Sequence, residues 1–159
     1  MEYSKTVPFT GKAARALNVA LSAFVNEGFQ ITSSTDDTLE VKGAGLSSTK
    51  QNPLKGVSEA HIAVRPSTIE MRAKLGGAEK MKKFLFIFPA GMFLMFMIVF
   101  GVLAFELPAF RRPLFFLIPA LALSPWIFLA PLMARSISRK TEEALDTLLS
   151  NMIMMGRDV

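Results

Sequence analysis

Two long runs without a charged side chain, at residues 84–105 and 114–134, dominate the second half of the chain. As α-helices they would be roughly 33 and 31 Å long, and the hydrocarbon core of a bilayer is about 30 Å thick. Across both runs and their connection, the only charged residues are Glu106, Arg111 and Arg112. A chain of 159 residues is too small to bury two such helices inside a soluble fold. The sequence therefore predicts a membrane protein with a two-helix transmembrane hairpin over residues 80–134.

The distribution of basic residues predicts how the hairpin is oriented. The connection, residues 106–113, is too short to cross a bilayer and contains two arginines. More basic residues lie on the outer flanks, and six of them are expected at the membrane interface: Lys80, Lys82, Lys83, Arg135, Arg139 and Lys140. Because cytoplasmic flanks carry the excess of Lys and Arg, both termini are predicted in the cytoplasm, with the connection across the cell inner membrane.

The second run is interrupted by prolines at positions 119, 125 and 131. Each proline lacks an N–H group and so frees the carbonyl four residues earlier, at Phe115, Leu121 and Ile127. Such carbonyls need partners in lipid. One interpretation is a kinked helix packed on its neighbour, and the other is a broken helix that lines a transport path. The absence of a charged side chain within either run argues against transport.

Small residues spaced four apart allow two helices to approach closely. Two such pairs occur in the second run, and they are the predicted packing residues: Ala120, Ser124, Ala130 and Ala134. The first run is instead rich in phenylalanine and methionine, which suits contact with lipid or with a neighbouring subunit.

Residues 1–79 are predicted to form a small cytoplasmic α+β head. Apolar residues recur at helical spacing from Thr10, a candidate N-cap, to a stop at Gly28. Four segments alternate between apolar and polar residues, as strands do: 29–32, 39–42, 60–65 and 69–75. The expected fold is one helix on an antiparallel sheet of three or four strands.

Residues 135–159 are predicted to form a C-terminal amphipathic helix. An apolar seam with alternating spacings of three and four residues offers a contact for another helix, and its members are Leu145, Leu148, Met152 and Met155. The seam could fold back on the head, lie on the membrane or bind a partner.

Little in the composition suits catalysis or cofactor binding. The chain has no cysteine and one histidine, which excludes disulfides, a thiolate nucleophile and a site with several histidines. His61 is expected on the polar sheet face with Glu59 as a possible partner, but no nucleophile accompanies them. The net charge of +5 lies largely beside the apolar runs, so lipid is a better partner than nucleic acid.

These features favour a non-catalytic accessory or scaffold subunit of a larger membrane complex, which packs through its hairpin and its head. The expected partners are membrane lipids and other integral membrane subunits, and no cofactor or small-molecule substrate is indicated. The alternatives are a small oligomeric transporter or channel, an accessory subunit specifically of a respiratory or photosynthetic complex, and a membrane-anchored enzyme.

Overall fold

The computed structural model describes residues 1–43, 53–106 and 114–157. The chain forms two compact units. The head combines Met1–Glu79 with Ile137–Val159, and the hairpin unit is Lys80–Ser136. The elements are β1 (Glu2–Pro8), α1 (Ala13–Asn26), β2 (Gln30–Ser34), β3 (Thr38–Lys42), η2 (Pro53–Gly56), β4 (Glu59–Arg65), β5 (Thr68–Lys74), α2 (Gly76–Glu106) and α3 (Leu114–Gly156).

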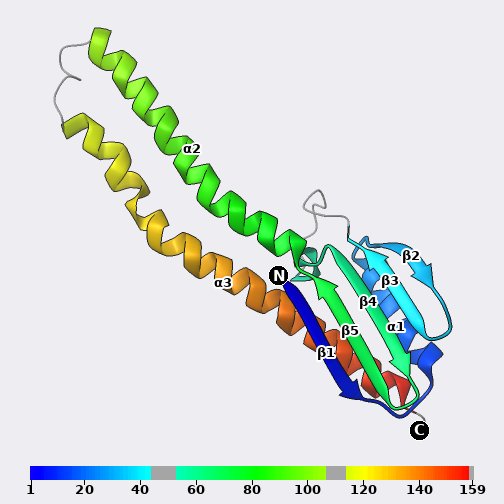
Figure 1. Cartoon of the computed structure of the whole chain (residues 1–159). Helices are drawn as coiled ribbons and strands as arrows, with labels where there is room; N and C mark the ends of the chain where they lie inside the picture. The colour runs from blue at the N-terminus through cyan, green and yellow to red at the C-terminus, as the bar shows by residue number, and fades with distance from the viewer. Residues whose placement is uncertain (44–52, 107–113, 158–159) are drawn as a thin grey trace. The chain divides into compact units, whose positions relative to one another are not determined.

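The head contains a five-stranded antiparallel sheet in the order β1-β5-β4-β3-β2 (Figure 1). The predicted antiparallel sheet with a helix is confirmed, and the four predicted strands correspond to β2–β5. The expected number of three or four strands was too low because β1 was missed. In β1, Tyr3 and Val7 are half-buried and the other five residues are exposed. An edge strand of this kind has almost no apolar alternation to detect.

Helix α1 packs against β2, β3 and β4. It starts at Ala13 rather than near Thr10, with Lys12 as an N-cap whose side chain makes no capping bond. The predicted stop at Gly28 is confirmed, since its φ of 82° is a left-handed conformation that glycine adopts without strain. One apolar stripe of α1 is buried, including Leu17 and Phe24.

The C-terminal part of α3 belongs to the head. Leu145, Leu149 and Met152 are buried in the same core as Phe24 and Met71. Of the three placements left open for the tail predicted at residues 135–159, the structure has packing on the head, since Ile137–Val159 belongs to this unit. Helix α3 continues into the tail without a break from the second apolar run. This part of α3 also contacts β1, where the Tyr3 hydroxyl donates a hydrogen bond to Asp146.

The hairpin unit contains most of α2 and the first half of α3. Among the described residues, these are the two helices whose length and composition suit membrane crossing. Large apolar side chains are exposed along one face of α2, including Leu94, Ile98 and Val102, which are spaced four apart. Helices in water do not normally expose such a face.

Candidate functional site

Pro89 interrupts the hydrogen-bond ladder of α2, and a side chain of α3 repairs the gap. A proline at position 89 has no N–H for the carbonyl of Leu85. The indole Nε1 of Trp126 donates to that carbonyl oxygen at 2.6 Å. Leu85 itself is only 6% exposed, so water has little access to this residue. One hydrogen bond thus satisfies a proline-freed acceptor and joins the two helices of the hairpin.

Pro125 creates the same problem in α3. It frees the carbonyl of Leu121, and the hydroxyl Oγ of Ser124 donates to that oxygen at 2.8 Å. Ser124 was predicted as a small packing residue, and the structure adds a polar role on its own helix. A hydroxyl beside a proline is a common way to satisfy a freed backbone group in an apolar medium.

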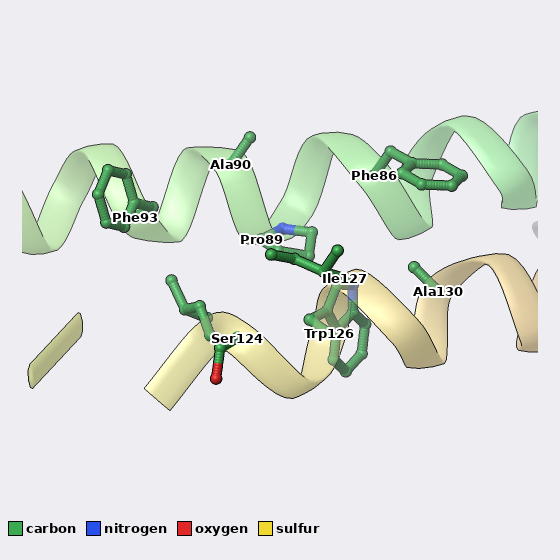
Figure 2. Close-up of a pocket in the computed structure, with 9 residues that line it drawn as sticks. Phe86, Pro89, Ala90, Phe93, Ser124, Trp126, Ile127 and Ala130 are labelled. Carbon is green, nitrogen blue, oxygen red and sulfur yellow. The ribbon is translucent and has the colours of Figure 1, made fainter. Parts of the chain in front are cut away.

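An open groove of about 420 Å³ lies between α2 and α3 within the hairpin unit (Figure 2). Its lining is almost wholly apolar and comes from both helices: Phe86, Pro89, Ala90, Phe93, Leu123, Ser124, Trp126, Ile127 and Ala130. The polar hydrogens of Ser124 and Trp126 are both engaged by the carbonyls described above. The groove therefore offers shape and apolar surface but no donor to a ligand.

Two of the predicted packing residues, Ala130 and Ala134, are 1% and 5% exposed. Their burial is what close helix packing requires. The side chain of Ala120 and the loop arginines, Arg111 and Arg112, lie outside the described residues.

No protein-family model, curated protein or solved structure matches this chain. The geometry of its residues is therefore the basis for a functional assignment.

The six predicted interface residues lie within five residues, along the sequence, of the points where the chain passes between the head and the hairpin unit. Lys80, Lys83, Arg135, Arg139 and Lys140 are exposed, and Lys82 is half-buried. The Nε of Arg139 lies 2.7 Å from the Glu143 carboxylate one turn along α3. This pair partly neutralises Arg139 but leaves it at the surface, where such a pair contributes little stability.

The polar sheet face pairs its charges differently from the sequence prediction. His61 Nδ1 lies 3.1 Å from Glu40 Oε1, on the neighbouring strand β3, and not against Glu59. Glu59 instead accepts from Lys74 Nζ at 2.7 Å. That bond lowers the pKa of Glu59 and raises the pKa of Lys74. The prediction of a His61–Glu59 pair was wrong because residues two apart on one strand are farther apart than cross-strand partners.

The same polar face also has a hollow lined by charged side chains. A shallow hollow of about 580 Å³ there is lined by both acidic and basic side chains, including Glu40, His61 and Arg72. Among the described residues, no group of three His, Cys, Asp or Glu side chains could hold a metal ion.

The predicted helix-binding seam is mostly occupied by the head itself. Leu145, Leu148 and Met152 are 0%, 6% and 0% exposed, whereas Met155 is 66% exposed. These three residues lie in one hydrophobic core with residues of the sheet and of α1, so they are not accessible to another protein.

A polar cluster joins β1 to α3 inside the head. The hydroxyl of Tyr3 donates to Asp146 Oδ1 at 2.6 Å, and Lys5 Nζ donates to the same oxygen at 2.8 Å. Lys5 and Tyr3 lower the pKa of Asp146. Burial and the bond to Asp146 raise the pKa of the Tyr3 phenol. Residues 143 positions apart could not be paired from the sequence.

Proposed function

We propose that this chain is a non-catalytic accessory subunit of a larger membrane complex, anchored by a preassembled two-helix hairpin. The observation that carries the proposal is the hydrogen bond from Trp126 to the carbonyl of Leu85. A carbonyl freed by proline in a bilayer can coordinate a substrate, or it can be satisfied permanently by the protein. Here an indole on the facing helix satisfies it, which favours a fixed packing unit.

The same reasoning makes a transport path the weaker alternative. The carbonyl of Leu121 is also satisfied, by Ser124, so two proline-freed acceptors are used within the hairpin. No charged side chain occurs between residues 84 and 105. Ion and proton pathways commonly need such groups.

The composition of the head supports the proposed orientation. One compact unit contains both Met1–Glu79 and Ile137–Val159, the segments on either side of the hairpin. Both flanks then lie on the same side of any membrane that the hairpin crosses. Together with the basic flanks, this supports a cytoplasmic head at the inner membrane.

The outer faces of the hairpin provide the proposed contact surface. On α2, Leu94, Ile98 and Val102 are 63%, 59% and 57% exposed and share one face. Helices in lipid associate through van der Waals packing, and the proposal assigns these three exposed side chains to that contact.

Site-specific photo-cross-linking in native membranes tests this proposal. A photoreactive residue is introduced in turn at Leu94, Ile98 and Val102, and at Phe96, a half-buried position, as the matched control. If a partner subunit packs on this face, the three exposed positions should each give a protein adduct of the same discrete mass. Position 96 should give a much weaker adduct. If the three positions give only lipid adducts, the chain has no partner on this face and the proposal is wrong.

A further inference from the structure

The head is built from two segments of the chain that the hairpin separates. Met1–Glu79 and Ile137–Val159 belong to one compact unit, and all of Lys80–Ser136 lies between them in the sequence. The hairpin is thus an insertion into the head and not an appendage at one end of it. Because the second segment is synthesised after both apolar helices, the core of the head stays incomplete until they have been made.

The second segment supplies part of the hydrophobic core of the head. Leu145 and Met152 are fully buried, and they belong to the same core as Phe24 and Met71 of the first segment. A domain of this size has little buried apolar surface to lose, because small domains are only marginally stable. We therefore expect that residues 1–79 do not keep their folded structure without the second segment.

The second segment contacts the first one along its whole length. Near its start, a Cβ at Gly56 would approach the Cγ2 of Thr141 to 2.7 Å, so η2 lies directly against α3. In the middle, Asp146 accepts the two hydrogen bonds from β1 described above. At its end, the backbone N–H of Lys12 donates to the carbonyl oxygen of Gly156 at 3.0 Å.

This two-segment construction restricts the membrane topologies in which the head can fold. The two segments can meet if both apolar helices cross the bilayer. If only one helix crosses, the two segments lie on opposite sides of a hydrocarbon layer about 30 Å thick. The core residues of each segment then lack the partners that bury them in the folded head.

We propose that the head is a topology lock: its core closes on a chain in which both helices cross the membrane, and the closed core then keeps them there. This inference rests on the proposed function, because it requires the hairpin to cross a membrane. It goes further by giving the head a role in membrane insertion that is separate from the basic flanks. The flanks select the side of the membrane, and the lock holds both ends of the hairpin on that side.

The test weakens the crossing of the second helix and measures whether the closed head compensates. Phe128→Arg places a charge at a position that is 73% exposed, where a charge in lipid is costly. The chain has no cysteine, so Met155→Cys, at another exposed position, gives a single labelling site in the tail.

The full chain is synthesised in a cell-free system that contains inverted inner-membrane vesicles. A maleimide that does not cross membranes labels the tail when the tail lies on the outer face of the vesicle, which is the cytoplasmic face. Labelling after the addition of detergent gives the total amount of chain.

Three further substitutions, each combined with Phe128→Arg, separate the lock from other effects. Met152→Asp and Met71→Asp place a charge in the core, one from each segment. Met154→Asp is the matched control, because it adds the same charge to the tail at a position that is 68% exposed. Met71 lies in β5, outside the tail and both apolar helices, so an effect of Met71→Asp on the tail requires the folded core.

With Phe128→Arg alone, and with Met154→Asp added, most tails should be labelled. Met152→Asp and Met71→Asp should each reduce the labelled fraction by at least about twofold, because a buried unpaired charge opens the core. Equal labelling in all three combined variants would overturn the lock. Loss of labelling with Phe128→Arg alone would also overturn it, because the closed core would then be too weak to hold the second helix.

Failure of the proposed function would give a different result. If alkaline carbonate extracts the wild-type chain from the vesicles, the hairpin is not in the bilayer and both proposals fail. If the wild-type chain resists extraction but the core variants label like the control, the hairpin crosses the membrane and the lock alone is wrong.

Discussion

The indole of Trp126 in α3 donates to the carbonyl oxygen of Leu85 in α2, the acceptor that Pro89 leaves without its helical partner. The bond explains how a proline can lie inside an apolar helix: the neighbouring helix supplies the missing donor. The same bond both compensates for Pro89 and holds α2 against α3. The effect of replacing Trp126 should therefore depend on whether residue 89 is proline.

Replacing Trp126 with phenylalanine should destabilise the hairpin by about 1–2 kcal/mol, because the Leu85 carbonyl loses its donor while most of the apolar surface remains. The measurement is unfolding of the purified chain by titration of mild detergent micelles with sodium dodecyl sulfate, followed by circular dichroism.

The control for this prediction is Pro89→Ala in the Trp126→Phe background. An alanine at position 89 has an N–H that can donate to Leu85 within α2. Stability should return toward the wild-type value. Equal effects of Trp126→Phe with and without Pro89→Ala would mean that the indole acts only through packing.

Met152→Ala should destabilise the head by about 2–5 kcal/mol, because this fully buried side chain leaves a cavity in the core. Met155→Ala, three residues along the same helix, should change stability by no more than about 0.5 kcal/mol, because Met155 is 66% exposed. Thermal unfolding of the full chain in detergent compares the two. A similar loss from both would argue that the C-terminal part of α3 does not pack as described.

Gly56→Ala should destabilise the head by about 1–3 kcal/mol. A Cβ at position 56 would collide with the Oγ1 of Thr141 and approach its Cγ2 to 2.7 Å. Thr141→Ala removes both atoms, so the double variant should lose less stability than the sum of the single variants. Strict additivity in chemical unfolding would count against close packing of η2 on α3.

Tyr3 is the one tyrosine of the chain, so its ionisation can be followed by ultraviolet absorbance. Burial and the hydrogen bond to Asp146 raise its pKa above the ordinary value of 10.0. The phenol in the folded head should therefore remain protonated above pH 10, and denaturation should return its titration to the ordinary range. An ordinary titration in the folded chain would exclude the Tyr3–Asp146 bond.

The raised pKa of Tyr3 should make the head less stable at high pH. The unfolded chain releases the phenolic proton before the folded chain does, so the stabilisation is complete below pH 10 and declines as pH rises above it. Tyr3→Phe should remove this alkaline decline from the unfolding midpoint, while the acidic side of the profile still reflects Asp146. The pKa of Asp146 is lowered in the head, so its contribution is present above about pH 4 and is lost as pH falls further.

Most of the fold could be predicted because its signals are local. Strands β2–β5 show alternating apolar residues, α1 shows helical spacing, and the seam of Leu145, Leu148 and Met152 is a periodic stripe in α3. The edge strand β1 was missed because its pairing with β5, and not its own pattern, makes it a strand. The His61 partner was assigned wrongly for a related reason, since the identity of a cross-strand neighbour depends on register.

The sequence by itself determined two apolar helices of membrane-crossing length, a mixed α and β head, and the carbonyls that the prolines of the second run would free. These follow from hydropathy, periodicity and the missing proline N–H, which are properties of short segments. Only the tertiary structure decided that the C-terminal helix fills the core of the head, and that Trp126 is the donor for Leu85. Both depend on contacts between residues far apart in the chain, whose free energies no local pattern encodes.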